Sequence, residues 1–139
     1  MKSLWVKLGV ILIGLAIFGY AEAWGADWKL YAAHESFLAY YDAQSITHPS
    51  KNIVRVQTRS NITEKGVLYL MRERGNEYEN LSHLIILSEI NCKEKTVRPL
   101  SINYYDNKGG VIYSSSSPGQ FDPIVPGTNV EILYKEVCK

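Results

Sequence analysis

The two cysteines, Cys92 and Cys138, limit the folds open to this chain of 139 residues. Two cysteines are too few for a zinc site with four cysteine ligands, or for a small domain held by several disulfide bonds. They can form one disulfide bond if the protein lies in an oxidising compartment. The chain must therefore fold around an ordinary hydrophobic core, with at most one covalent link to close it.

The first 23 residues have the three parts of a secretory signal peptide. Lys2 and Lys7 supply positive charge, residues 8–20 form an apolar run, and residues 21–23 are a cleavage signal of the A-x-A type. An uncleaved membrane anchor is the alternative, but the run is shorter than the about 20 residues of a membrane-spanning helix. We expect cleavage after this signal, which leaves residues 24–139 as a single exported domain without a membrane span.

Export predicts a periplasmic or extracellular location, where a disulfide bond between Cys92 and Cys138 persists. Two free thiols are the alternative. No cysteine near the cleavage signal is available to accept a lipid, so we expect a protein that is not lipid-anchored. Residues 24–139 carry equal numbers of basic and acidic side chains. This balance argues against a nucleic-acid-binding protein, which normally has a basic excess.

Alternating apolar and polar residues, interrupted by turn residues, predict an antiparallel sheet of about six strands. Asn and Gly within residues 106–110 mark a tight hairpin turn between the last two strands. Pro99 lacks a backbone N–H, which indicates an edge or a bulge in its strand. The predicted strands span residues 28–33, 37–42, 53–59, 81–92, 96–105 and 111–117.

A change of period predicts one helix inserted between the third and fourth strands. Residues 63–74 place Val67, Leu70 and Met71 at helical spacing, and Gly75 follows as a stop. We therefore expect an amphipathic helix in this segment.

A second helix is predicted at the C-terminus. Thr128 and Glu131 have the spacing of a capping box. An apolar stripe follows, and it packs on one face of the sheet. A disulfide bond would then tie the end of this helix to the strand that ends at Cys92, so the predicted fold class is α+β. The stripe comprises Val130, Leu133, Tyr134 and Val137.

No catalytic or metal-binding pattern occurs in the sequence. His34, His48 and His83 do not have the spacing of metal ligands. A phosphate loop, a dinucleotide fingerprint and a serine-nucleophile motif are also missing. Cysteines joined in a disulfide bond cannot act as nucleophiles. We therefore predict a protein that is not an enzyme and that holds no metal or cofactor.

Tyrosine is the most unusual part of the composition, with ten residues. The adjacent pairs Tyr40-Tyr41 and Tyr104-Tyr105 place one ring on each face of their strands. Tyrosine is common at recognition surfaces because it combines a large contact area with a polar tip. Together with Tyr113, these residues are candidate ligand-binding residues. The alternative is that the rings fill a small core and cover an open sheet face.

The whole segment from the first strand to the C-terminus resembles the surface-adhesin protein E family of bacterial envelope proteins. The resemblance implies an antiparallel sheet with a C-terminal helix held against one face by the disulfide bond of Cys92 and Cys138. It also implies a surface or periplasmic protein that adheres to host extracellular proteins. The residues that carry it are Trp28, Tyr41-Asp42-x-x-Ser45-Ile46, Glu89-Ile90-Asn91-Cys92, Tyr104-Tyr105-Asp106-x-x-Gly109, Pro123-Ile124-Val125-Pro126-Gly127 and Val137-Cys138-Lys139.

The sequence therefore predicts a non-enzymatic exported module of the protein-binding or adhesion type. Its expected partner is a protein or another component of the cell envelope, and its oligomeric state is left open. The alternative function is a periplasmic carrier that holds a small ligand on a concave, tyrosine-rich face of the sheet.

Overall fold

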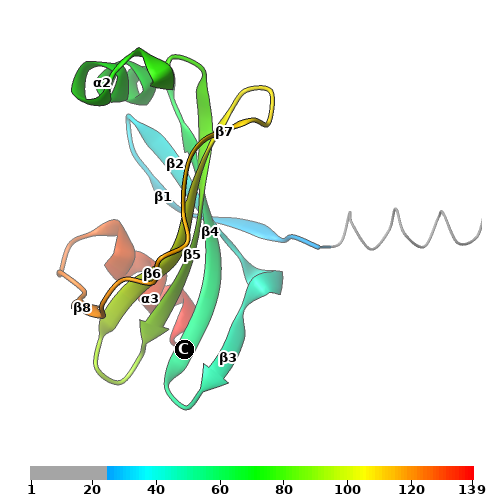
Figure 1. Ribbon diagram of the computed structural model, residues 1–139. Coiled ribbons are helices and arrows are strands. Elements are labelled where there is room, and N and C mark those ends of the chain that lie inside the picture. Colours follow the sequence, from blue (N-terminus) through cyan, green and yellow to red (C-terminus); the bar gives the residue numbers. More distant parts are fainter. Residues whose placement is uncertain (1–24) are drawn as a thin grey trace, which may run out of the picture.

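The computed structural model of this protein describes residues 25–139 (Figure 1). The predicted signal peptide and its cleavage site lie outside the described residues. Strands β1, β2, β4, β5, β6 and β7 are neighbours in that order, and every pairing between them is antiparallel. The six are Trp28–Ala33, Phe37–Asp42, Ile53–Ile62, Leu81–Asn91, Thr96–Asp106 and Val111–Ser115.

Two short strands complete an eight-stranded sheet. Strand β3 (Thr47–Ser50) pairs with β4 and is not among the strands predicted from the sequence. Strand β8 (Asp122–Pro123) pairs with β6. The predicted fold class is confirmed, with helix α2 (Glu64–Arg74) inserted between β4 and β5 and helix α3 (Asn129–Val137) at the C-terminus.

Pro99 lies beside a bulge in β6, as its missing N–H predicts. Leu87 pairs with Ser101 while Ser88 pairs with Pro99, so Leu100 is an extra residue in the ladder. A bulge places one unpaired residue in a strand and bends it. The carbonyl of Pro99 instead accepts a hydrogen bond from the N–H of Gly119 at 2.9 Å, which leads the chain after β7 back along β6.

The segment Tyr41-Asp42-x-x-Ser45-Ile46, one of those that carry the family resemblance, forms a backbone turn at the end of β2. The buried carboxylate of Asp42 accepts hydrogen bonds from the N–H groups of Asp27 (2.7 Å) and Gln44 (3.0 Å), and caps a single 3-10 turn at Ala43–Ser45. The Ser45 hydroxyl donates to the carbonyl of Asp42 and accepts from the N–H of Gln57. These bonds fasten the end of β2 to β4.

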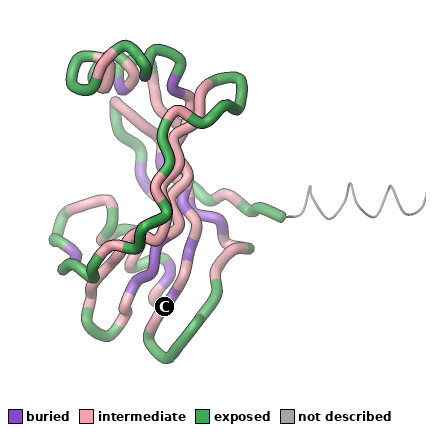
Figure 2. Tube along the Cα trace, viewed as in Figure 1, coloured by how far each residue is buried: buried purple, intermediate pink, exposed green. Residues whose placement is uncertain are grey.

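The two faces of the sheet differ in burial. Along β4, the buried side chains Val54, Val56 and Thr58 alternate with the half-exposed Arg55, Gln57 and Arg59. We name the first set and its neighbours the helix face, and the second the open face. Figure 1 places both α-helices on one side of the sheet, and Figure 2 shows that buried residues gather near α3.

Helix α3 covers one end of the helix face. Leu133 and Val137 are buried against Val54, Val56 and Ile90 in the main core cluster. Of the predicted stripe, Tyr134 is half-buried and its hydroxyl donates to the carbonyl of Cys92 at 3.0 Å, whereas Val130 is largely exposed.

The prediction of a capping box at the start of α3 is wrong, because its hydrogen bonds do not form. The Thr128 side chain makes no capping hydrogen bond, and its hydroxyl donates instead to the carbonyl of Val125. Glu131 accepts from the N–H of Gly127 and forms an ion pair with Lys95 at 3.1 Å. The tertiary ion pair therefore engages the carboxylate that the local motif would have used.

The disulfide bond between Cys92 and Cys138 is present and closes the fold. It joins the residue after β5 to the C-cap of α3, with 46 residues of sequence separation. By the loop-entropy model, a link across a loop of this length stabilises the folded chain by about 4 kcal/mol.

We predict that Cys138→Ala releases α3 and lowers the free energy of unfolding by about 2–5 kcal/mol, because the unfolded chain regains its loop entropy. Urea titration of the oxidised protein measures the change. Cys92→Ala and the reduced wild type serve as controls, since all three lose the same bond and should unfold at similar urea concentrations. Labelling of two free thiols in the native, oxidised protein contradicts this account.

Candidate functional site

The first turn of helix α2 is fastened to the β1–β2 hairpin by hydrogen bonds. The hydroxyl of the N-cap Thr63 accepts from the N–H of Gly66 and donates to the carbonyl of Glu35 at 2.6 Å. The N–H of Thr63 donates to the carbonyl of Ser36 at 3.0 Å. Threonine is a favoured N-cap because its oxygen satisfies an unpaired N–H of the first turn. Here the same residue also positions the helix against the hairpin.

Gly66 permits the closest approach between α2 and the hairpin. A Cβ atom at this position would lie 2.2 Å from the carbonyl oxygen of Ser36 and 2.7 Å from Cγ2 of Ile62. Gly66 is also the buried residue of the helix. The helix ends at Gly75, whose φ of 114° suits glycine.

The five residues after Gly66 are apolar, and none of them is buried. Leu68 and Tyr69 are 59% and 58% exposed, and Val67, Leu70 and Met71 are only partly covered. The predicted helix is therefore confirmed, but its apolar residues do not join the core. An exposed apolar run of this kind is typical of an interaction site.

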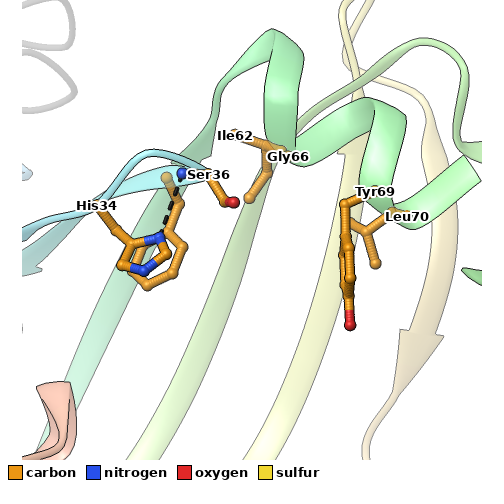
Figure 3. A pocket seen from close by; sticks show the side chains of 7 residues that line it. His34, Ser36, Ile62, Gly66, Tyr69 and Leu70 are labelled. Atoms are coloured by element: carbon orange, nitrogen blue, oxygen red, sulfur yellow. Dashed lines mark hydrogen bonds between the residues drawn. The ribbon is translucent and has the colours of Figure 1, made fainter.

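A cavity of about 410 Å³ lies between α2 and the β1–β2 hairpin (Figure 3). Its wall is almost entirely apolar. The His34 ring stacks on Phe37 with centroids 5.2 Å apart, and its Nδ1 accepts from the N–H of Ser36 at 3.3 Å. Figure 3 shows the Tyr69 side chain hanging from the helix in front of the sheet. The lining residues are His34, Ser36, Phe37, Ile62, Gly66, Tyr69 and Leu70.

A second, more open depression of about 510 Å³ lies along other residues of the same helix, and Ile62 belongs to both. Helix α2 therefore offers apolar side chains to both the cavity and the depression, and its first turn is fastened to the β1–β2 hairpin. Besides Ile62, the residues that line this second depression are Glu64, Val67, Leu68, Met71, Glu79 and Leu81.

This arrangement suits the binding of apolar groups. In the cavity beside the hairpin, the side chains of His34 and Ser36 and the Tyr69 hydroxyl supply the polar groups. Within residues 25–139, no three His, Cys, Asp or Glu side chains gather where they could hold a metal ion. A ligand with an apolar body and few polar groups, or an apolar protein surface, fits such a lining.

The five candidate tyrosines do not form one site. Tyr41 belongs to the core, and its hydroxyl lies 3.5 Å from Glu136 of α3. Tyr40 and Tyr105 belong to the open face. Tyr104 and Tyr113 lie on the helix face, with ring centroids 5.6 Å apart.

The sequence reasoning missed two neighbours of the helix-face pair. Buried Tyr78 meets Tyr104 edge to face at 5.9 Å, and the Arg74 guanidinium lies 3.5 Å from the Tyr104 hydroxyl. It also missed the cavity residues. The available signal was the unbroken apolar run of residues 67–71, which is longer than one face of an amphipathic helix needs.

We predict that Gly66→Ala destabilises the protein by about 1–3 kcal/mol, because the new methyl group forces α2 away from Ser36. In an unconstrained helix the same change stabilises by about 1 kcal/mol, so the sign of the effect is diagnostic. Urea titration measures it, and Glu73→Ala in the exposed last turn serves as the control. A gain in stability for Gly66→Ala would show that α2 is not seated on the hairpin.

None of the helices within residues 25–139 has the length and apolar character required to cross a membrane. Neither the comparison with curated proteins nor the comparison with solved structures finds a match. The family model described as surface-adhesin protein E matches residues 28–139, which span the whole sheet and both helices. The chain therefore belongs to the surface-adhesin protein E family.

Proposed function

We propose that this protein is a non-enzymatic, protein-binding module of the cell envelope, and that helix α2 is its main contact surface. The family is one of surface adhesins, which implies export and binding partners. The observation that carries the proposal is the exposed apolar run at residues 67–71. None of its members is buried, and Leu68 and Tyr69 are largely exposed. Displaying such side chains to water does not stabilise the fold.

The flanks of the helix support the same function. Lys65 forms a solvent-exposed ion pair with Glu35, and Arg72 and Arg74 follow the apolar run. Protein interfaces commonly combine an apolar centre with a charged rim and are enriched in Tyr and Arg. Tyr69 and Leu68 have the exposure and position of such a centre. This proposal places the protein in the periplasm or at the cell surface.

We predict that the double variant Leu68→Glu/Tyr69→Glu binds immobilised extracellular-matrix or envelope proteins more than about tenfold more weakly than the wild type, because truncated or charged hot-spot residues typically cost at least about 2 kcal/mol. Ile132→Glu is the matched control: it also places a charge at an exposed apolar helical position, but on α3. Equal binding by the double variant and the wild type excludes α2 as the contact surface. Absence of any partner above background counts against the function itself.

The cavity favours a second candidate function, that of a small-ligand carrier. A cavity of this volume with an apolar lining accommodates a small amphiphile or an aromatic compound. The predicted tyrosine-rich binding face receives less support, since Tyr40 and Tyr105 are on the opposite side of the sheet from Tyr104 and Tyr113.

The carrier function predicts that native mass spectrometry of the protein, purified from its own host, shows a retained small molecule. Leu70→Glu should abolish its retention, because a charge in an apolar cavity is costly to desolvate. The exposed Glu73→Gln, on the same helix, serves as the control. A spectrum with the bare chain alone rules out tight carriage of a small ligand.

A further inference from the structure

The open face of the sheet is a surface that neither α-helix covers. Both α-helices lie on the other side (Figure 1). The open-face side chains of β4, β5 and β6 are half-exposed except Glu89, whereas several of their neighbours on the helix face are buried. From the register, the open-face residues of β4, β5 and β6 are Arg55, Gln57, Arg59, Asn61, His83, Ile85, Leu87, Glu89, Arg98, Ser101, Asn103 and Tyr105.

This face has a positive charge excess, although the domain as a whole is balanced. The set contains three arginines, Arg55, Arg59 and Arg98, and Glu89 is its single carboxylate. Charge of one sign gathered on one face attracts ligands of the opposite sign, and the attraction weakens with salt.

Glu89 holds two of the arginines in fixed positions. Nε and Nη2 of Arg55 donate to its Oε2 at 3.2 and 2.9 Å, and the same two atoms of Arg98 donate to its Oε1 at 3.0 and 2.7 Å. Burial disfavours the charged carboxylate, but the hydrogen bonds and charges of Arg98 and Arg55 outweigh this and lower the pKa of Glu89. The three groups together keep one net positive charge.

The outer edges of both guanidinium groups remain available to a ligand. Arg55 and Arg98 have side chains 41% and 34% exposed, against 5% for Glu89. Their hydrogen bonds to residues of the described part of the chain use only Nε and Nη2, which leaves Nη1 for an external oxyanion. The Arg98 guanidinium also lies over the Phe121 ring, 4.6 Å from its centroid.

The third arginine lies farther along β4. Nε of Arg59 donates to the Asn61 side chain at 2.7 Å, and in the register Arg59 is opposite Tyr40 of β2. On the next two strands, β5 and β6, the rings of His83 and Tyr105 stack with centroids 5.0 Å apart. Burial and, to a lesser extent, the charge of Arg59 lower the pKa of His83. This end of the face therefore presents one cation beside flat rings.

Neutral hydrogen-bonding groups lie between Arg59 and the pair of Arg55 and Arg98. Gln57, Leu87 and Ser101 form one row across β4, β5 and β6, and Asn103 follows in the next. The face thus combines anion-binding groups, amides, hydroxyls and rings on strands β4, β5 and β6, each of which is paired on both sides and offers no free edge to an extended peptide. Hydroxylated sugar rings that carry carboxylate or sulfate groups complement each of these features.

We propose that the open face binds a linear acidic polysaccharide, whose carboxylate or sulfate groups pair with Arg55, Arg59 and Arg98. This site is separate from helix α2 and does not rest on the protein-binding function proposed above. Sulfate and carboxylate share the recognition chemistry, so two probes distinguish them: heparin fragments carry both groups, and hyaluronan fragments carry carboxylates alone.

The test is calorimetric titration of the folded protein, residues 24–139, with these two probes at low and at physiological salt. We expect binding that weakens as salt increases. Arg59→Gln, which leaves the Glu89 ion pairs intact, should weaken it about threefold to fivefold, the value of one exposed charge pair. Glu89→Gln should strengthen it by a similar factor, because it removes the only carboxylate of the face. A purely structural role for Glu89 predicts no such gain.

The double variant Lys65→Gln/Arg72→Gln is the matched control, since it removes two cations from helix α2 and none from the open face. It should bind both probes as the wild type does, and so should Leu68→Glu/Tyr69→Glu. Three results overturn the proposal: no binding of either probe at low salt, equal weakening by the α2 variants, or binding of polyglutamate as tight as that of heparin. Circular dichroism of each variant confirms that it is folded.

Discussion

The contact between α3 and one end of the helix face is the interaction on which the rest of the structure depends. Leu133 and Val137 bury the start of β4 and the end of β5, and the Cys92–Cys138 bond holds the end of the helix there. A domain of this size buries a limited share of its surface, so a covalent link has a large relative effect. Without the bond, a helix of nine residues would have to stay docked by its apolar stripe, the Tyr134 hydroxyl and the Lys95–Glu131 ion pair.

Because α3 covers only one end of one face, most of the sheet must be stable while half-exposed. Two groups stabilise the half-exposed sheet without a covering layer. The cross-strand ion pairs of Arg55 and Arg98 with Glu89 satisfy their polar groups, and the rings of Tyr78, Tyr104 and Tyr113 pack on one another. The same surfaces are then free for recognition. The protein-binding proposal for α2 and the polysaccharide proposal for the open face both follow from the small extent of the core.

Much of the fold was predictable from local signals. Alternation in Ile53–Arg59, the turn residues at 106–110 and the apolar stripe of α3 each depend on neighbours in sequence, and the main elements were found where predicted. Strands β3 and β8 were missed, because the first contains Pro49 and the second has only two residues. The capping box failed because Lys95, distant in sequence, engages Glu131. The candidate tyrosines were divided among three environments, since adjacent residues face opposite sides of a strand.

The sequence by itself determined the strand and helix order, the disulfide partners and the family, because periodicity, turn chemistry and a single pair of cysteines leave few alternatives. Only the tertiary structure decided which apolar residues become core. The run at 67–71 has the hydrophobicity of a core helix, yet only Gly66 of this helix is buried, against the Ser36 carbonyl, while Leu68 and Tyr69 stay exposed. Likewise, the gathering of Arg55, Arg59 and Arg98 on one face depends on the register of three strands. Burial and charge proximity are properties of packing, which the order of residues alone does not contain.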